Sequence, residues 1–250
     1  MRAIMVSVDY ADLLRLTLPY NRAHFDEVMV VTSARDEATI EVARANDANV
    51  FTTELFWADG AIFNKFRALE AGLDALGRSG WFCIMDADVL WPKSIAWTRQ
   101  ACGTLWTPRR RMWAEWPTRP HWMAQDIPWE RDWSRFPLHP QQREWAGYTQ
   151  IFSADDPHLG EPPWHETNWR HAGGANSFFQ AKWPDECKIR PAFEVLHLGP
   201  AGRNWCGRAT MMADGTMPDG AAEKSGQVRQ FIRGRGKGET RFDAEKMRQP

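Results

Sequence analysis

The chain has little cysteine and little tyrosine, and it contains no long hydrophobic run. Its four cysteines are far apart and form no CxxC pair, so reduced thiols are favoured over a disulfide framework or a zinc site. No apolar run approaches the roughly 20 residues that span a bilayer. The first residues, MRAIMVSVDY, also lack the apolar region of a signal peptide. We therefore expect a cytoplasmic protein with no membrane partner.

An excess of charge of one sign is also missing, because the formal net charge of the 250 residues is only -1. A nucleic-acid surface would therefore have to be a local patch. Tryptophan is abundant instead, with 15 residues against 3 tyrosines, and many fall between residues 91 and 183 in proline-rich segments. Clustered tryptophans outside regular structure form flat binding walls, or they pin down irregular loops. The sequence leaves both interpretations open.

The first hundred residues alternate between two kinds of hydrophobic pattern. Continuous apolar runs predict buried strands, and apolar residues at helical spacing predict helices between them. The predicted strands are residues 3–8, 27–32, 49–53 and 81–85, and the predicted helices are 13–20, 36–46 and 63–76. This order predicts an α/β protein in which helices cover both faces of a βαβ sheet.

The alternation fails after about residue 100. Residues 106–145 are dense in Trp, Pro and Arg and show no clear period. Beyond them, the patterns predict strands at 146–153 and 193–199 and a short helix at 175–184. From about Gly215 the chain is rich in glycine and charge, which we interpret as a basic C-terminal tail or extension.

The stretch WFCIMDADVLWP, residues 81–92, places two aspartates at the end of a predicted buried strand. Asp86 and Asp88 are two residues apart, so their side chains point to the same side of the strand. Two close carboxylates repel each other, and a cation between them stabilises the pair. Oxygen ligands suit Mg²⁺ or Mn²⁺, and such a metal often holds a diphosphate. The alternative is that an aspartate here caps a helix.

This strand and its aspartates, following βαβ units, resemble the GT-A fold of nucleotide-sugar glycosyltransferases. The resemblance covers roughly residues 3–210 and includes Asn64-Lys65, GYTQIF, HAGGANSFFQAKWP and VLHLGP…NWCGR. It implies a Rossmann-like mixed sheet flanked by helices, with an irregular Trp/Pro-rich acceptor region and a C-terminal extension. It also implies a donor-binding half at residues 1–100, an acceptor-binding and metal-completing half at 101–212, and a tail at 213–250.

The resemblance further implies roles for single residues. Asp86 and Asp88 would hold Mn²⁺ or Mg²⁺ together with the sugar diphosphate of a nucleoside-diphosphate sugar, such as a UDP-sugar, and His197 would complete the metal site. Cationic side chains would neutralise the departing diphosphate, and residues at the first strand ends would line the base and ribose pocket. The implied donor-binding residues are Asp9, Thr32, Asp36, Lys65, Asp86, Arg203 and Arg208.

One departure from the family pattern concerns the catalytic base. The resemblance places a carboxylate before SFFQAKWP, but this sequence has Gly173, Gly174, Ala175 and Asn176 there. An asparagine side chain cannot deprotonate an acceptor hydroxyl. Either another carboxylate serves, or the enzyme retains configuration by a front-face route in which the departing phosphate takes the proton. The candidate bases are Glu166, Asp155 and Asp156.

The acceptor is less constrained. Tryptophans and arginines in residues 107–122 suit both sugar faces and exposed bases. The compact chain resembles glycosyltransferases encoded by phages, some of which modify hydroxymethylated bases in DNA. Such a base would be flipped into an aromatic pocket of an enzyme working in a bacterium or a phage-infected cell. A glycan or a small molecule is the alternative acceptor. The candidate acceptor-binding residues are Arg110, Trp113, Trp116, Trp122, Trp164 and Asn176.

Two rival classes remain. A nucleotidyltransferase also uses aspartate-held metal on an α/β sheet, usually with a Gly-rich phosphate loop after the first strand. Here that loop reads SVDYADLL and contains no glycine, which weighs against this class. A catalytically inactive, Trp-rich module that binds carbohydrate or nucleic acid is the non-enzymatic rival. Metal-dependent hydrolysis of a nucleotide sugar would exclude the binding module, and release of pyrophosphate would indicate the nucleotidyltransferase.

Overall fold

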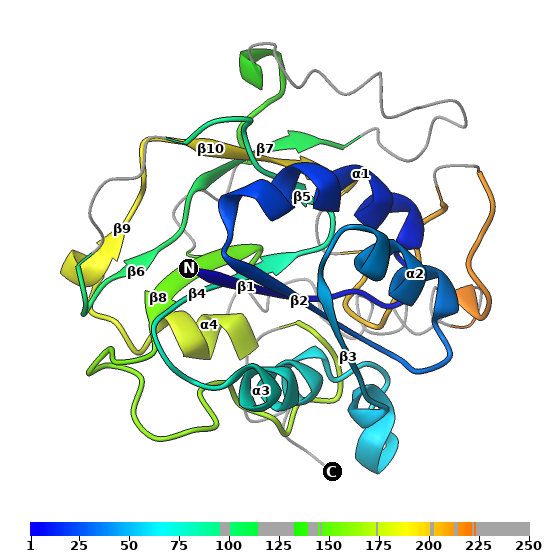
Figure 1. Ribbon diagram of the computed structural model, residues 1–250, viewed down its shortest axis with the longest axis horizontal. Helices are drawn as coiled ribbons and strands as arrows, with labels where there is room; N and C mark the ends of the chain where they lie inside the picture. Colours follow the sequence, from blue (N-terminus) through cyan, green and yellow to red (C-terminus); the bar gives the residue numbers. More distant parts are fainter. Residues whose placement is uncertain are drawn as a thin grey trace, which may run out of the picture.

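A seven-stranded mixed sheet organises the protein, with strand order β3-β2-β1-β4-β8-β6-β9 (Figure 1). The computed structural model describes residues 1–95, 101–114, 133–139, 145, 147–173, 175–200, 203–212, 215–221 and 223. The four strands that the first hundred residues contribute to this sheet pair in parallel, as the sequence predicts, and β8 then pairs antiparallel to β4. The strands of this sheet are β1 (Arg2–Val6), β2 (Glu27–Thr32), β3 (Asn49–Thr52), β4 (Trp81–Asp86), β6 (Leu105–Trp106), β8 (Thr149–Ser153) and β9 (Lys188–Ile189).

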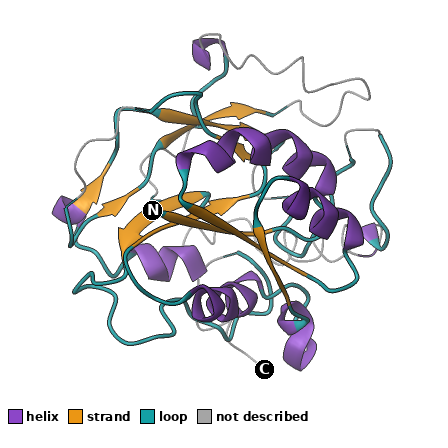
Figure 2. Cartoon of the chain, viewed as in Figure 1, coloured by secondary structure: helices purple, strands orange, loops and turns teal. Residues whose placement is uncertain are grey.

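Helices cover both faces of this sheet (Figures 1 and 2). One face packs against α1 and α2, and the opposite face packs against α3 and α4. No described helix is long and apolar enough to cross a membrane. The α-helices are α1 (Ala11–Asn21), α2 (Glu37–Ala45), α3 (Lys65–Leu76) and α4 (Ala175–Gln180), and the 3-10 helices are η1 (Arg22–His24), η2 (Leu55–Gly60), η4 (Trp133–Arg135) and η5 (Asp185–Cys187).

A second, three-stranded sheet brings the late part of the chain back to the end of β4. Its order is β5-β10-β7, with β5 at Val89–Leu90, β10 at Glu194–Leu198 and β7 at Arg109–Trp113. β10 pairs antiparallel with β5 and parallel with β7. Because β5 begins one residue after Asp88, this pairing fixes β10 beside the aspartate pair.

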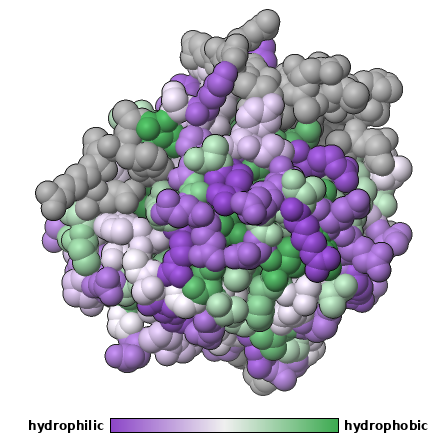
Figure 3. Space-filling view, in the orientation of Figure 1, coloured by the Kyte–Doolittle hydropathy of each residue, from purple (hydrophilic) through white to green (hydrophobic). Residues whose placement is uncertain are grey.

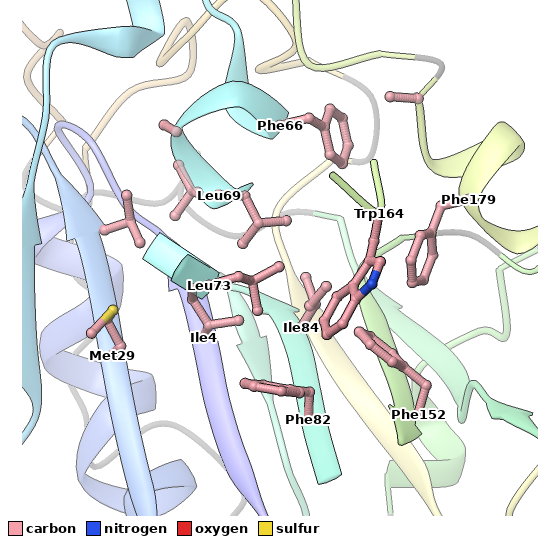
Figure 4. Close-up of a cluster of buried hydrophobic side chains, with 14 of the residues drawn as sticks. Ile4, Met29, Phe66, Leu69, Leu73, Phe82, Ile84, Phe152, Trp164 and Phe179 are labelled. Carbon is pink, nitrogen blue, oxygen red and sulfur yellow. The ribbon is translucent and has the colours of Figure 1, made fainter. Parts of the chain in front are cut away.

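The core on the α3 face explains why helix and sheet lie so close together. Leu69 and Leu73 of α3 pack onto Ile4 and Ile84 (Figure 4). Gly72 lets the helix approach the sheet, because a Cβ there would lie 2.5 Å from a methyl group of Val31.

The outer surface on the side shown in Figure 3 is mainly hydrophilic with smaller apolar areas between.

Two expectations about local structure need correction. The helix predicted to end near Pro19 runs on to Asn21, so the proline sits inside its last turn, where it removes one hydrogen-bond donor. The described tryptophans between residues 91 and 183 mostly fill the core, which favours a packing role over flat binding walls. Those that are at most 9% exposed are Trp91, Trp106, Trp113, Trp164, Trp169 and Trp183.

Candidate functional site

The carboxyl ends of the parallel strands gather the predicted donor-binding residues at one edge of the sheet. Val6 at the end of β1 pairs with Asp86 at the end of β4. Thr32 ends β2, the other neighbour of β1. Ligands of open α/β sheets bind outside these ends. This edge therefore contains the candidate site.

Asp36 ties the first two strand ends together. Its Oδ1 accepts the Thr39 amide at 3.2 Å, which caps α2. Its Oδ2 accepts the Asp9 amide at 2.7 Å and the Thr32 hydroxyl at 3.2 Å. Asp9 has a φ of 61°, which a residue with a side chain rarely adopts. The three residues predicted for the base and ribose pocket thus form one hydrogen-bonded group that fixes the turn after β1.

Asp88 and His197 face each other across the junction of β5 and β10. The Asp88 carbonyl accepts the Leu198 amide at 2.8 Å, and 3.7 Å separates Asp88 Oδ1 from His197 Nε2. His197 Nδ1 lies 3.1 Å from the Gly199 carbonyl, and Nε2 is the ring nitrogen that faces Asp88. Asp88 Oδ1 is buried and has no hydrogen-bond partner among the described residues.

The electrostatics of Asp88 follow from this burial. Burial raises the pKa of its carboxyl group, His197 acts in the opposite direction, and the nearby charge of Asp86 raises the pKa further. A buried carboxylate oxygen without a donor is unfavourable unless a cation or a proton reaches it. The position is therefore suited to a positively charged ligand.

Lys65 forms an ion pair with the other aspartate of the motif. It is the first residue of α3, and Asn64 caps this helix by accepting the Arg67 amide at 3.0 Å. The Lys65 ammonium contacts Asp86 Oδ1, with the two side chains 11% and 31% exposed. Lys65 therefore places a positive charge at the edge where β4 ends.

These residues fit a divalent cation that has few protein ligands. No three Cys, His, Asp or Glu side chains of the described residues gather closely enough to hold a metal by themselves. Asp88 and His197 offer one oxygen and one nitrogen ligand, and the unpartnered Asp88 Oδ1 is the atom that a cation would satisfy. Diphosphate oxygens and water can supply the remaining positions of Mg²⁺ or Mn²⁺. Asp86, the third expected ligand, is paired with Lys65.

The two arginines expected at the diphosphate have different environments. Arg203 is exposed, whereas Arg208 is completely buried and its side chain binds both carboxylate oxygens of Asp12, at 2.9 and 3.1 Å. The remaining Arg208 N–H bonds go to the carbonyls of Asp9, Thr210 and Met211. A direct contact with diphosphate would have to break these bonds. Arg208 therefore stabilises the turn after β1 through its bonds to Asp9 and Asp12.

Asn176 lies beside the strand that follows the acceptor region. A Cβ on Gly147 would come within 1.9–2.1 Å of the terminal side-chain atoms of Asn176, so this side chain rests directly on the Gly147 backbone. The next residue, Tyr148, accepts the Asp86 amide at 2.9 Å. Asn176 Oδ1 is buried and has no hydrogen-bond partner among the described residues. Asn176 therefore contacts the residue next to Tyr148, whose carbonyl is hydrogen-bonded to the Asp86 amide.

Two of the three candidate bases lie at the wrong edge of the sheet. β8 is antiparallel to β4, so its last residue, Ser153, pairs with Trp81 at the start of β4. Asp155 and Asp156 follow that end and are about 16 Å from the Asp86 end, at roughly 3.3 Å per strand residue. Asp156 is buried and accepts the Trp183 indole N–H at 2.9 Å. The reversed direction of β8 therefore places both carboxylates at the edge of the sheet opposite Asp86.

Glu166 remains as the candidate base. Its Oε2 accepts the Trp169 indole N–H at 3.0 Å. The next residue, Thr167, accepts the side-chain amide of Asn64 at 2.7 Å through its carbonyl. Asn64 directly precedes Lys65, the first residue of α3, so this bond places Glu166 near the start of that helix.

The expected acceptor residues are only partly found at the surface. Trp113 and Trp164 are each 4% exposed. Trp113 packs against Phe136 with the two rings tilted, and Trp164 packs against Phe82 and Phe152. Both tryptophans therefore support the core and are corrected from acceptor contacts to packing residues. The Arg110 guanidinium lies 4.4 Å from the centre of the Tyr148 ring. Trp116, Trp122 and most of the basic tail lie outside the described residues.

Sequence reasoning missed one buried polar group beneath the site. Glu70 of α3 is 4% exposed and accepts the backbone amides of Trp164 and His165, at 3.0 and 2.9 Å. His165 Nδ1 is 2.6 Å from Glu70 Oε1. Although burial acts to raise it, the contacts with His165 and Arg78 hold the pKa of Glu70 below its ordinary value. The available signal was an acid within the apolar stripe of α3, four residues after Phe66.

Comparisons of the sequence with protein-family models and with curated proteins gave no match. The structure is similar to two structures of glucosyl-3-phosphoglycerate synthase from Mycobacterium tuberculosis. With phosphoglyceric acid bound, the identity is 18%, the TM-score is 0.33, and 44% of this chain matches 43% of that one. With Mn²⁺, uridine diphosphate and glucosyl-3-phosphoglycerate bound, the identity is 14%, the TM-score is 0.46, and 94% of this chain matches 78% of that one.

Two other enzymes have a similar arrangement of sheet and helices. For mannosyl-3-phosphoglycerate synthase from Rubrobacter xylanophilus, the identity is 14%, the TM-score is 0.37, and 62% of this chain matches 53% of that one. For the inositol-1-phosphate CTP transferase from T. maritima, the identity is 11%, the TM-score is 0.44, and 92% of this chain matches 96% of that one. The chain thus spans less than two thirds of two of these relatives' structures. At these identities the likeness concerns the fold alone.

Proposed function

We propose that this protein is a GT-A type, metal-dependent glycosyltransferase that moves a sugar from a nucleoside-diphosphate sugar to an acceptor hydroxyl. The observation that carries the proposal is the buried Asp88 Oδ1, which has no hydrogen-bond partner among the described residues and lies 3.7 Å from His197 Nε2, at the carboxyl edge of a parallel sheet. Hydrogen-bonded protein groups fix the neighbouring strand ends, so the edge is preorganised for a ligand.

Each group at this edge has a distinct task in the proposed reaction. Asp88 and His197 would hold Mn²⁺ or Mg²⁺, which supplies positive charge to the diphosphate when bound. Lys65 adds a second positive charge at the same edge and stabilises the leaving diphosphate as negative charge develops on it. The group of Asp9, Thr32 and Asp36 would form the wall for the nucleoside. Arg203, which is exposed on the late loop, would approach the diphosphate from the open side.

The proton of the acceptor hydroxyl has two routes. Glu166 is the remaining carboxylate candidate, because its segment is hydrogen-bonded to the start of α3. In the other route the departing phosphate takes the proton on the front face, and no protein base is needed. A Glu166→Gln variant separates the routes, because it lowers kcat strongly only when Glu166 is the base.

The donor and the acceptor are proposed at the level of their chemistry. We expect a UDP-sugar as donor, and either a hydroxymethylated base in phage DNA or a saccharide or small molecule as acceptor. The basic residues that would favour DNA lie mostly outside the described residues. A cytoplasmic site of action, in a bacterium or a phage-infected cell, belongs to the same proposal.

The test is release of nucleoside diphosphate from a panel of nucleotide sugars with Mn²⁺, comparing wild type with Asp88→Asn. We expect release that requires metal and falls at least tenfold in the variant, since a lost charge-assisted contact is worth roughly 1.5–3 kcal/mol. Asp155→Asn is the matched control, because that carboxylate lies at the other edge. Pyrophosphate release would instead indicate a nucleotidyltransferase. If no donor is turned over, the catalytically inactive binding module is the interpretation that remains.

A further inference from the structure

A pocket of about 580 Å³ opens on the flank of the molecule, between the segment 163–168 and α4. The helix α4, which borders it, lies on the same face of the sheet as α3 (Figure 1). Glu166, Thr167 and Asn168 line one side, and Phe178, Phe179 and Lys182 line the other. Its volume falls within the range of roughly 300–1,000 Å³ that is usual for small-molecule sites.

Buried contacts hold the wall of this pocket in place. Glu70 accepts two successive backbone amides, of Trp164 and His165. The His165 ring stacks on Phe179 at a centroid distance of 4.0 Å, which joins the segment to α4. Asn64 donates to the Thr167 carbonyl at 2.7 Å. A wall fixed in this way loses little conformational entropy when a ligand binds.

The chemistry of the lining suits a neutral polyhydroxylated ligand. The lining includes Glu166, Thr167 and Asn168, whose carboxylate, hydroxyl and amide are groups that accept and donate hydrogen bonds. One carboxylate oxygen of Glu166 already accepts the Trp169 indole N–H. Phe178 supplies an aromatic surface for the apolar face of a sugar ring. Among the described residues of the lining, Lys182 is the one with a lysine or arginine side chain, and it donates to the Leu159 carbonyl at 2.6 Å. A nucleic acid would need several cations to neutralise its phosphates.

The pocket is connected to the candidate site by the start of α3. Its Thr167 carbonyl is bonded to Asn64, and the next residue along the chain, Lys65, contacts Asp86. Phe66, one residue further, stacks on His165 at 5.3 Å. The Thr167 part of the pocket wall is therefore joined to the start of α3, whose Lys65 contacts Asp86 at the carboxyl edge.

We propose that this flank pocket binds a saccharide unit of the acceptor, so that the acceptor is an oligosaccharide or glycan whose terminal hydroxyl extends to the Asp86–Asp88 edge. This proposal rests on the proposed glycosyltransferase function and names its acceptor class. A monosaccharide that fills the pocket would leave the edge empty, so transfer is expected to favour longer chains.

Binding is measured first by ligand-observed NMR, with the full-length Asp88→Asn protein and neutral oligosaccharides of glucose, mannose or N-acetylglucosamine. We expect saturation transfer from the protein to at least one series, and about tenfold weaker binding in Phe178→Ala and in Asn168→Ala. Ser177→Ala is the matched control, because Ser177 is exposed on the same helix and does not line the pocket. Asn168 is exposed, so its variant also keeps the test valid if Phe178→Ala folds poorly.

The second measurement is transfer from the active donor to the saccharides and, separately, to hydroxymethylated single-stranded and duplex DNA. Saccharide transfer with an acceptor KM that rises about tenfold in Asn168→Ala and stays at the wild-type value in Ser177→Ala supports the proposal. Donor hydrolysis without saccharide binding would overturn the pocket assignment and leave the transferase intact. Transfer to DNA at the same rate in wild type and in the pocket variants would also overturn the pocket assignment. Saccharide binding without turnover of any donor would support the pocket as a saccharide site and contradict the proposed glycosyltransferase activity.

Discussion

Replacing Glu70 with glutamine tests the buried group that holds the flank pocket. The Glu70 side chain is 5% exposed. Its Oε1 accepts from the His165 amide and Nδ1, and its Oε2 accepts from the Trp164 amide at 3.0 Å and from Arg78 at 2.7 Å. A glutamine has one acceptor oxygen and a donating amide, so at least one backbone N–H loses its partner and the ion pair is lost. An orphaned buried donor costs about 1–3 kcal/mol, and a bond to a charged group contributes about 1.5–3 kcal/mol.

We therefore expect Glu70→Gln to lower the free energy of unfolding by about 3 kcal/mol. At roughly 2–4 °C per kcal/mol for a chain of this size, Tm falls by about 6–12 °C. Thermal and urea unfolding followed by circular dichroism measure both quantities. Glu41→Gln, an exposed glutamate of α2, is the control and should change stability by less than about 0.5 kcal/mol. A Glu70→Gln protein as stable as this control would refute the buried network.

Three further predictions concern the same framework. Arg208→Met should destabilise the protein by about 3–5 kcal/mol, because it removes the buried ion pair with Asp12 and the Arg208 hydrogen bonds to three backbone carbonyls; a Tm equal to that of wild type would contradict this. Burial lowers the pKa of His165 below its ordinary 6.5, so the unfolded chain binds the proton more readily. The contribution of His165 to stability is therefore complete above about pH 6.5 and is lost as the pH falls through the folded pKa. Urea midpoints across pH should show a decline that is smaller in His165→Gln. Gly147→Ala should destabilise through the clash with Asn176, and Asn176→Ala should restore part of the loss in a double-mutant cycle.

Much of the sheet is predictable from the sequence because its strands are continuous apolar runs. Residues 27–32 are predicted and observed as β2, and the strand predicted at 81–85 forms β4, which extends to Asp86. The Asp86–Asp88 motif could be placed at the carboxyl edge because the order of elements fixes where parallel strands end. The structure confirms a mixed α/β sheet flanked by helices.

The remaining features depend on contacts that no local pattern encodes. The direction of β8 decides that Asp155 lies at the far edge, and an alternating pattern is the same in either direction. Arg208 is buried because it meets Asp12, 196 positions earlier in the chain. Trp164 is in the core because Arg78 and Phe152 surround it. Such long-range pairs can be recognised only once the fold is known.

The most direct test of the metal and donor site is binding of Mn²⁺ in the presence of UDP, followed by electron paramagnetic resonance. The account predicts that wild type binds Mn²⁺ more tightly when UDP is added, and that Asp88→Asn and His197→Ala each weaken this binding at least tenfold. Asp155→Asn should bind as wild type does. Equal Mn²⁺ affinity in wild type and Asp88→Asn would contradict the assignment of the buried Asp88 oxygen as a metal ligand, and with it the proposed chemistry at this edge.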